Sequence, residues 1–165
     1  MIDKRDVQAF FDRLAPDWDA GMVRNEAVIA RILDNAGVCE GCTVLDVACG
    51  TGVLFGDYVK RGAARVTAVD LSPEMIAVGR EKIARRGLQQ RISLDVGDAE
   101  KLAFEDAAFD AATVAFGVRN FGDIPQGLHE MGRTLKKGGT IAVLEFSKPD
   151  NRLFGKPVSY THLRA

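Results

Sequence analysis

The chain has little of what disulfide frameworks, metal centres and membrane spans are built from. Its 165 residues include three cysteines and two histidines, and its 22 lysines and arginines nearly balance 23 aspartates and glutamates. An odd, small number of cysteines does not suit a disulfide framework, and a balanced charge leaves no basic footprint for nucleic acid. No run approaches the roughly 18 apolar residues of a membrane-spanning helix, and the first residues lack the apolar centre of a signal peptide. We therefore expect a cytoplasmic protein that binds no nucleic acid and makes at most peripheral membrane contact.

Two of the cysteines, Cys39 and Cys42, stand in a C-x-x-C spacing that is typical of half a structural zinc site. Such a site takes four ligands. The remaining cysteine, Cys49, lies within a glycine-rich segment, and His129 and His162 are far along the chain. We therefore expect no metal and interpret the pair as small residues that lead into a strand.

The first part of the chain has helical patterning. A hydrophobic content of 47% is enough for one domain with a core, in a chain too short for two. Residues 4–14 carry apolar side chains at helical spacing up to Pro16, and a second helical pattern over residues 28–33 ends at Gly37. The sequence thus predicts an N-terminal helical segment, residues 1–38.

From residue 39 onward, apolar runs alternate with helical patterns. The predicted strands are residues 43–48, 65–70, 91–96, 109–116 and 140–146, and the predicted helices are residues 53–60, 72–86 and 124–135, with Ser72 as an N-cap. This alternation indicates an α/β fold, a Rossmann-like, doubly wound and mainly parallel sheet of about five strands. Ligands of such sheets bind beyond the carboxyl ends of the strands. We therefore expect the functional residues directly after the strands, in residues 50–52, at Asp70, at Asp98 and Ala99, and in residues 115–120.

The loop after the first predicted strand carries Gly50 and Gly52 within the run VLDVACGTG. It is no phosphate loop, because no Gly-Lys-Ser/Thr follows the glycines. A dinucleotide fingerprint starting at Gly50 needs a third glycine where Phe55 stands, yet Asp70 lies about 20 residues on, where an acid binds a ribose. On these residues alone, a nicotinamide- or flavin-dependent oxidoreductase stays open as an alternative.

Two further acids favour a different cofactor. Asp46 lies inside the first strand, and a buried carboxylate is costly unless it meets a cation or several donors. S-adenosylmethionine offers an ammonium and a sulfonium group and has no phosphate, whereas this acid would repel a pyrophosphate. Asp98 follows the third strand, where it would accept a hydrogen bond from an adenine amino group. Each acid has a plainer interpretation, as a carboxylate that caps local amides or as a turn residue, but three acids placed on successive strands favour S-adenosylmethionine.

These segments together resemble the ordered motifs of class I methyltransferases, which use S-adenosylmethionine. The motifs are VLDVACGTG (44–52), AVDLSPEM (68–75), GDAEKLAFEDAAFD (97–110) and LKKGGTIAVLEF (135–146). The resemblance implies that the first loop wraps the methionine part of the cofactor, with Ala48 where many members have glycine. It also implies that Asp70 bonds the ribose hydroxyls and that Asp98 with Ala99 reads adenine. The cofactor-binding residues expected on this basis are Asp46, Ala48, Gly50, Thr51, Gly52, Asp70, Leu71, Asp98, Ala99 and Ala115.

A narrower resemblance, over residues 115–149, is to the ubiquinone/menaquinone biosynthesis methyltransferases, which methylate a ring carbon of a polyprenylated quinol precursor. Its specific parts are FGVRN (116–120) and LEFSKP (144–149). It implies a demethylmenaquinol- or quinol-type acceptor, whose ring carbon attacks only once the neighbouring hydroxyl has lost its proton. Arg119 would stabilise the phenolate or hold an activating water, and Asn120 would orient it. The plainer interpretation of Arg119 is a structural ion pair.

The N-terminal segment fits that narrower family less well. Residues 10–19 give only Trp18-Asp19 where the family has a Tyr-Asp pair, and its Ser…His…Trp pattern is absent. The first half instead resembles general small-molecule methyltransferases. An O- or N-methyltransferase for another small molecule therefore stays open, as does a cofactor-binding module without activity. In class I enzymes such a segment forms a lid, which implies this role for residues 1–38, and Trp18 would cover the donor or acceptor or pack in the core.

The end of the chain matches no expected element. Class I methyltransferases finish with two further strands, whereas PVSYTHLRA (157–165) resembles read-through of non-native sequence. We expect a core domain over residues 39–149 that lacks the usual C-terminal β-hairpin, in a truncated fragment of low activity, and an irregular tail over residues 150–165. The strand at residues 140–146 would then be an exposed edge through which the chain could oligomerise.

Overall fold

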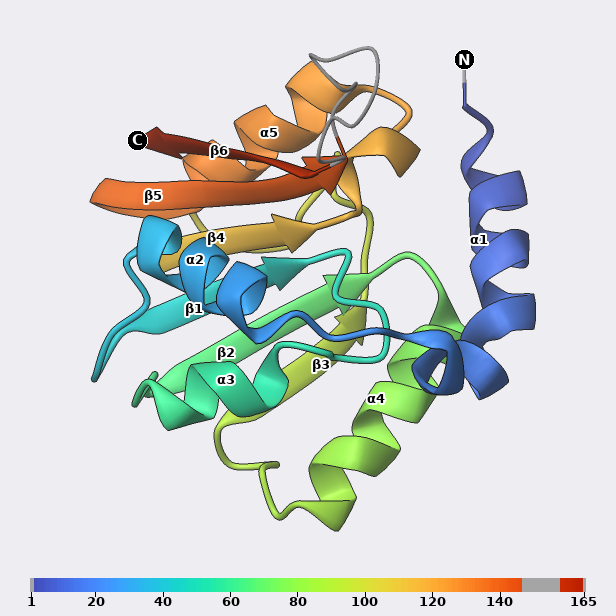
Figure 1. The fold of residues 1–165 in the computed structure, drawn as a ribbon. Helices are drawn as coiled ribbons and strands as arrows, with labels where there is room; N and C mark the ends of the chain where they lie inside the picture. Colours follow the sequence, from blue (N-terminus) through green and yellow to red (C-terminus); the bar gives the residue numbers. More distant parts are fainter. Residues whose placement is uncertain (1, 147–157, 165) are drawn as a thin grey trace, which may run out of the picture.

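The computed structural model describes residues 2–146, together with the backbone of residues 158–164. From the second helix onward, helices separate most of the successive strands (Figure 1). The elements are α1 (Lys4–Leu14), the 3₁₀ turn η1 (Ala15–Gly21), α2 (Glu26–Ala36), β1 (Thr43–Val47), α3 (Phe55–Lys60), β2 (Arg65–Asp70), α4 (Pro73–Arg85), β3 (Ile92–Val96), β4 (Phe109–Ala115), the 3₁₀ turn η2 (Val118–Asn120), α5 (Ile124–Arg133), β5 (Leu135–Phe146) and β6 (Val158–Arg164).

The strands form one sheet in the order β3-β2-β1-β4-β5-β6. The first five strands pair in parallel, which confirms the predicted doubly wound sheet. The chain builds outward from β1 through β2 to β3 and then returns to the other side of β1 with β4. The strand order therefore reverses between β1 and β4, and ligands of open α/β sheets bind at such a point.

The end of the sheet differs from the prediction. The backbone of β6 pairs antiparallel with β5, from Phe146 opposite Val158 to Thr140 opposite Arg164. The expectation of an irregular tail is therefore wrong for residues 158–164, and residues 150–157 lie outside the described part. The expectation that β5 forms the exposed edge of the sheet is also wrong, because β6 takes its hydrogen bonds.

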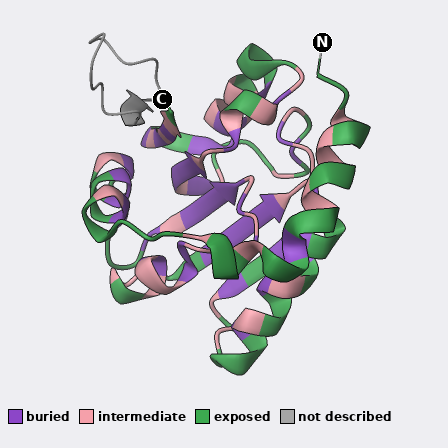
Figure 2. Ribbon diagram, turned by 45° about the vertical axis from the view of Figure 1, so that its right-hand side comes forward, coloured by how far each residue is buried: buried purple, intermediate pink, exposed green. Residues whose placement is uncertain are grey.

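Helices cover the sheet unequally on its two faces. One buried cluster joins α2, α3 and α4 to one face, and a second joins α5 and the segment after β3 to the other. Successive strand residues alternate between these clusters, as the pleat requires, so that Val44 faces the first layer and Leu45 the second. Figure 2 shows that burial concentrates in the strands, whereas α1 beside the N-terminus contributes no buried residue. Helix α1 therefore lies on the surface, outside the buried core.

Local sequence explains where the helices begin and end. Asn25 and Ser72 cap α2 and α4 by accepting backbone N–H bonds from Val28 and Met75, and Gly37 closes α2 in the left-handed conformation with φ of 72°. These ends agree with the predicted Ser72 cap and Gly37 stop. Within the described residues, every helix is too short or too polar to cross a membrane.

Two boundaries were predicted less well. Helix α3 begins at Phe55, not at residue 53, because the chain is still turning after the glycine loop. Strand β5 begins at Leu135, five residues before the predicted start, and first pairs with Phe109. The register then shifts between Phe109 and Ala111, beside the turn at Gly138 with φ of 85°. A bulge of this kind interrupts the alternation from which a strand is recognised.

Candidate functional site

A cavity of about 520 Å³ opens at the carboxyl ends of the strands. Ten of the twelve predicted site residues line it, and they come from the ends of β1, β2, β3 and β4 and from η2. These are Ala48, Gly50, Thr51, Asp70, Leu71, Asp98, Ala99, Ala115, Arg119 and Asn120. The other two, Asp46 and Gly52, are not among its lining residues. The position is the one expected from the reversal of strand order.

The glycine loop owes its shape to three residues with positive φ, Ala48 at 53°, Gly50 at 55° and Gly52 at 82°. A side chain at Gly52 is excluded, because its Cβ would lie 2.0 Å from the Phe55 ring. Gly117 lies across from Ala48, where an added Cβ would approach the Ala48 Cβ to 2.4 Å. Ala48 adopts a backbone conformation that costs a residue with a side chain about 1–2 kcal/mol. The loop is therefore strained at Ala48, the position where the resemblance implies glycine in many class I methyltransferases.

Asp70 joins two of the loops around the cavity. Its Oδ2 accepts a hydrogen bond from the Gly50 N–H at 2.8 Å, and its Oδ1 accepts one from the Ser72 N–H at 2.9 Å. Burial raises the pKa of Asp70 above its usual value, and the negative charge of Asp12 adds to that rise. Each carboxylate oxygen retains an unused lone pair, so Asp70 can accept further bonds from the hydroxyls of a ligand.

Asp46 lies on β1 but outside the cavity. It is 3% exposed and faces the layer formed by α2, α3 and α4, where the Thr113 hydroxyl lies 3.3 Å from its Oδ1. The Tyr58 hydroxyl bonds that same threonine at 2.6 Å. Burial raises the pKa of Asp46 to about 7. In the part of the chain that the structure describes, no basic side chain forms an ion pair with it, and the geometry does not bring Asp46 to the cavity wall.

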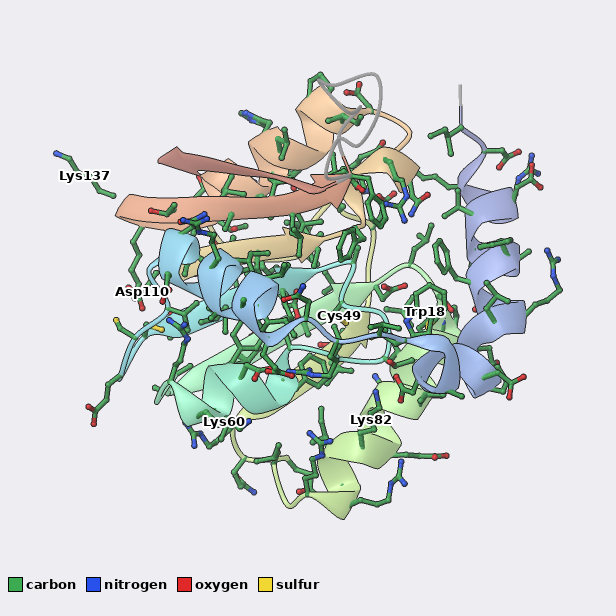
Figure 3. The ribbon with its side chains drawn as sticks, in the orientation of Figure 1. Trp18, Cys49, Lys60, Lys82, Asp110 and Lys137 are labelled. Atoms are coloured by element: carbon green, nitrogen blue, oxygen red, sulfur yellow. The ribbon has the colours of Figure 1, made fainter. Side chains whose placement is uncertain are left out.

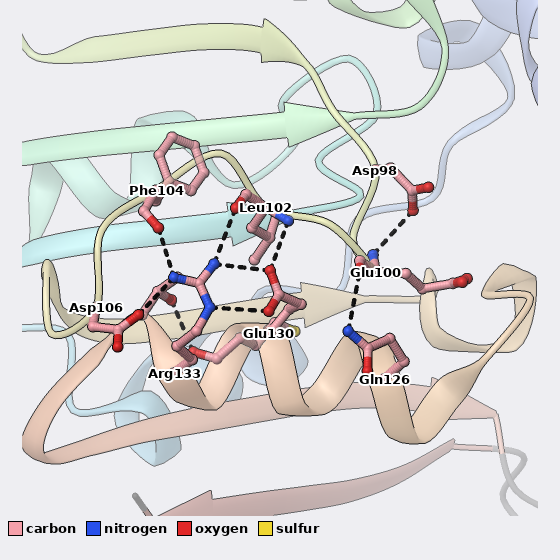
Figure 4. Close-up of polar contacts among 10 residues, drawn as sticks. Asp98, Glu100, Leu102, Phe104, Asp106, Gln126, Glu130 and Arg133 are labelled. Carbon is pink, nitrogen blue, oxygen red and sulfur yellow. Dashed lines mark hydrogen bonds and ion pairs between the residues drawn. The ribbon is translucent and has the colours of Figure 1, made fainter.

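Asp98 lines the cavity from the loop after β3, but it already has a cationic partner. The Lys4 Nζ of α1 lies 2.7 Å from Asp98 Oδ2 and 2.7 Å from Glu100 Oε2. The Glu100 N–H also bonds Asp98 Oδ1 at 3.0 Å, as Figure 4 shows. Both carboxylate oxygens of Asp98 therefore already have a partner, Oδ2 the Lys4 ammonium group and Oδ1 the Glu100 N–H.

The long loop after β3 contains no helix, and α5 holds it in place (Figure 4). Arg133 donates hydrogen bonds to the carbonyls of Leu102 at 3.0 Å and Phe104 at 2.7 Å, and it pairs with Glu130 at 2.8 Å. Glu130 in turn accepts the Leu102 N–H at 2.9 Å. The ion pair raises the pKa of Arg133 and lowers that of Glu130. Sequence reasoning missed this network, whose only signal is the i,i+3 spacing of the pair.

The N-terminal segment lies over the cavity and is held by polar contacts. Asp19 of η1 accepts a hydrogen bond from the Thr51 hydroxyl at 2.6 Å and pairs with Lys82 of α4 at 2.6 Å. The labels of Trp18 and Lys82 in Figure 3 lie at this same edge of the molecule. Asp12 accepts a hydrogen bond from the Ser72 hydroxyl at 2.5 Å. No pattern in the sequence predicts these contacts, because they join residues more than thirty positions apart.

Trp18 is placed above the glycine loop. A Cβ on Gly50 would lie 3.9 Å from Trp18 Nε1, and the Trp18 ring makes an edge contact with Phe11 at 5.6 Å between centroids. Both aromatic residues line the cavity. The position agrees with a covering role for Trp18, and the side chain is half-buried, not enclosed in the core.

Arg119 reaches the cavity from η2 and forms an ion pair with Glu145 at the end of β5. Its guanidinium carbon lies 5.3 Å from the centroid of the Phe146 ring, and Phe146 stacks against Phe116 at 4.8 Å. Asn120 lines the same wall. The two interpretations of Arg119 are therefore compatible, since one arginine both lines the cavity and makes an ion pair.

Comparison with known proteins assigns the chain to a family. The sequence model of the ubiE/COQ5 methyltransferase family matches residues 3–162. A ubiquinone/menaquinone biosynthesis C-methyltransferase UbiE of Geobacter sulfurreducens is 38% identical over 165 residues, with 96% of this chain and 64% of the relative covered. One of Idiomarina loihiensis is 43% identical over 119 residues, with 71% and 47% covered. The chain thus spans less than two thirds of the length of these relatives.

Solved structures share the fold. The crystal structure of the [4+2]-cyclase SpnF superposes with a TM-score of 0.81 at 23% identity, covering 90% of this chain and 62% of that one. A SAM-dependent methyltransferase from Aquifex aeolicus gives a TM-score of 0.67 at 27% identity, covering 78% and 69%. Because one of these proteins is named a cyclase, the fold alone does not specify methyl transfer. The match of the family's sequence model over residues 3–162 is the more specific finding, and by it the chain belongs to the ubiE/COQ5 methyltransferase family.

Proposed function

We propose that the protein is an S-adenosylmethionine-dependent methyltransferase that methylates a ring carbon of a demethylmenaquinol- or quinol-type acceptor. Family membership supports the reaction class. The observation that carries the proposal is the cavity at the reversal of strand order, which is lined by residues of the glycine loop, Asp70, Asp98 and Arg119. A cytoplasmic location and a small, hydrophobic acceptor belong to the same proposal.

The cofactor would lie along the strand ends. Ala48, Gly50 and Thr51 would contact its methionine part, Asp70 with Leu71 its ribose, and Asp98 with Ala99 its adenine. These residues fit because Asp70 and Asp98 supply acceptors for hydroxyl and amino donors. We assign residues 1–38 as a lid and residues 39–149 as the cofactor-binding core.

The glycine loop argues against a dinucleotide. Phe55 stands where the third glycine of a dinucleotide fingerprint would be, and its ring packs against Gly52 at the start of α3. In a dinucleotide-binding loop, the third glycine allows the helix to pack closely against the strand. The bulky Phe55 side chain at this position does not allow that close packing. The nicotinamide alternative therefore has no support beyond Asp70.

S-adenosylmethionine supplies the methyl group, so the protein has to position the acceptor, exclude water and stabilise the acceptor's developing negative charge. Phe116 and Phe146 form an apolar wall of the cavity. Arg119 beside them would hold the phenolate oxygen of the acceptor, with Glu145 fixing the guanidinium and Asn120 orienting the ring or a bridging water. The hydroxyl gives its proton to a water before the ring carbon attacks, and the ring carbon gives up its own hydrogen as a proton to water once it carries the methyl group.

Two measurements test the proposal. Calorimetry of the chain with S-adenosylhomocysteine and, separately, with NADH should show binding of the first compound alone. Methyl transfer from labelled S-adenosylmethionine should then be measured with demethylmenaquinol and with a panel of phenols, alcohols and amines. Labelling of a ring carbon supports the quinol assignment, whereas labelling of oxygen or nitrogen would replace it with an O- or N-methyltransferase. Binding of NADH without the homocysteine compound would overturn the cofactor assignment.

A further inference from the structure

The turn before β1 brings two cysteines together. The Cys42 N–H donates to the Cys39 carbonyl at 3.3 Å, which closes a four-residue turn, and Gly41 has φ of 78°, the conformation that a type II turn requires at its third residue. Such a turn holds its first and fourth Cα atoms within about 7 Å. Disulfides join Cα atoms about 4.4–6.8 Å apart. The turn therefore brings the two Cα atoms close to the spacing that a Cys39–Cys42 bridge needs.

The side chains of the pair interact as free thiols. The Cys39 N–H donates to Cys42 Sγ at 3.3 Å. Burial raises the pKa of the Cys42 thiol, and the hydrogen bond from the Cys39 backbone N–H offsets part of that rise. Cys39 is exposed, whereas Cys42 is 5% exposed. An oxidant in solution therefore meets Cys39 first, with Cys42 next to it.

The pair is isolated from other groups that could give it a different role. Among the described residues, no group of three or more His, Cys, Asp or Glu side chains is arranged to hold a metal ion. The third cysteine, Cys49, is separated from Cys42 by the whole of β1, which spans Thr43–Val47. A bridge from Cys42 to Cys49 therefore does not fit this arrangement.

We propose that Cys39 and Cys42 form a redox-active dithiol that a peroxide oxidises to an intramolecular disulfide. The Cys39 thiol gives its proton to water, and the resulting thiolate attacks the peroxide and breaks its O–O bond, which leaves a sulfenic acid on Cys39 and releases hydroxide. The hydroxide takes up the proton that Cys39 lost and becomes one water. The Cys42 sulfur then displaces the hydroxyl group from the Cys39 sulfur, and this hydroxide takes the Cys42 proton and leaves as a second water. The two thiols lose two electrons and the peroxide gains them. A dithiol reductant reverses the bridge by exchange.

The dithiol is distinct from the proposed methyltransferase site. Its turn is tied to the segment before β2, where the Gly41 N–H bonds the Gly62 carbonyl at 2.9 Å and the Ala64 N–H bonds the Cys42 carbonyl at 2.8 Å. The next residue, Thr43, donates its N–H to Asp110 at 2.8 Å. Figure 3 labels Asp110 and Trp18 at opposite ends of the sheet, so the turn lies at the amino ends of the strands, away from the cavity. Oxidation of the pair and binding of S-adenosylhomocysteine are therefore expected to be independent.

The test is oxidation of the whole chain with a small excess of hydrogen peroxide, followed by alkylation, intact mass measurement and peptide mapping. The expected product has lost the mass of two hydrogens, carries one alkylatable thiol at Cys49, and yields a Cys39–Cys42 linked peptide that dithiothreitol separates. Cys49→Ser is the matched control and should form the same bridge. Cys39→Ser should form none, and Cys42→Ser should accumulate a sulfenic acid on Cys39 that a dimedone reagent traps.

Three results would overturn the proposal. These are three alkylatable thiols after treatment of the native protein, a bridge that includes Cys49 or a second chain, and sulfenic acid that forms first on Cys42. Because Cys42 is buried, circular dichroism of Cys42→Ser checks that the variant is folded, and the exposed Cys39→Ser keeps the test decisive if it is not. As a separate readout, binding of S-adenosylhomocysteine by the oxidised protein distinguishes failure of this proposal from failure of the proposed function.

Discussion

Asp19 and Lys82 join the N-terminal segment to α4 at the edge of the cavity, with 2.6 Å between Asp19 Oδ2 and Lys82 Nζ. Lys82 also donates to the carbonyl and the hydroxyl of Thr51, at 2.9 Å each. These contacts therefore link the N-terminal segment, α4 and the glycine loop. Since α1 buries none of its residues, polar contacts of this kind carry much of the attachment of the N-terminal segment.

Removing the Asp19–Lys82 ion pair should increase the local opening of the N-terminal segment more than it destabilises the whole fold. In Lys82→Met we expect amide hydrogen exchange to accelerate within residues 4–21, while the free energy of unfolding falls by about 1 kcal/mol or less, because Asp19 is 44% exposed. Lys60→Met is the matched control, since Lys60 is 79% exposed and lies 3.9 Å from its partner Asp57. Equal exchange rates within residues 4–21 in the two variants would mean that apolar contacts, not the ion pair, hold the N-terminal segment.

The Asp19 contact should also depend on pH. The Lys82 and Thr51 side chains outweigh burial and lower the pKa of Asp19 below its usual value. A carboxyl whose pKa is depressed in the folded protein stabilises it above the unfolded pKa, near 4, and loses that contribution as the pH falls further. Protection of the amides of residues 4–21 against exchange, compared with the unfolded chain at the same pH, should therefore fall between about pH 4 and pH 3 in the native chain. In Lys82→Met this protection should stay flat.

Replacement of Asp70 tests the cofactor site. Asp70→Ala should weaken binding of S-adenosylhomocysteine by about 1–3 kcal/mol, the scale of lost charge-assisted hydrogen bonds, as measured by calorimetry. It also removes the acceptors for the Gly50 and Ser72 N–H groups, so Asp70→Asn is the second variant, because its one remaining oxygen keeps one of those bonds. Asp95→Asn, an exposed acid on β3, is the control. Unchanged binding in both Asp70 variants contradicts the ribose assignment.

The buried Asp46 should make the stability of the fold depend on pH in the direction opposite to that expected from Asp19. Its pKa is raised from 3.8 to about 7 by burial, so the unfolded chain releases this proton at lower pH than the folded protein does. Stability from this group is complete below about pH 4 and declines as the pH rises toward 7, by as much as a few kcal/mol at roughly 1.4 kcal/mol per pKa unit. Urea unfolding of Asp46→Asn should show a flatter profile between pH 4 and pH 7 and higher stability at pH 8. A steeper decline in the variant would contradict the assignment.

The contrast between Asp46 and Asp70 shows how far the sequence predicts the site. The apolar runs predicted the strands, and residues that follow parallel strands share one edge of the sheet, where Asp70 and Asp98 both line the cavity. Strand alternation also puts Asp46 on the same face as Val44, but which helices cover that face depends on how the chain crosses the sheet. The contact of Lys4 with Asp98 spans 94 positions and leaves no periodic signal. Strand β6 was missed because its segment matched no family motif.

Replacement of Ala48 by glycine should stabilise the fold. Its φ of 53° costs a residue with a side chain about 1–2 kcal/mol, while glycine loses about 0.4–1 kcal/mol through the greater freedom of the unfolded chain. Ala48→Gly should therefore raise the free energy of unfolding by about 0.5–1 kcal/mol and Tm by roughly 2–4 °C. Ala112→Gly, in a buried strand position with ordinary φ, should lower both. A loss of stability in Ala48→Gly would indicate that its methyl group packs better than its φ suggests.

Arg119 and Glu145 separate a catalytic role from a structural one. If Arg119 holds the acceptor oxygen, Arg119→Gln should lower kcat for methyl transfer by about 10²–10³-fold, the scale of losing one donor to a developing anion. Glu145→Gln breaks the same ion pair but leaves the guanidinium in the cavity, so its kcat should fall far less. Both variants should lose about the same stability, roughly 1 kcal/mol or less, because Arg119 is 47% exposed. Equal losses of kcat in the two variants would mean that Arg119 acts only through its ion pair with Glu145. Stabilisation of the acceptor's phenolate would then have to come from other residues that line the cavity.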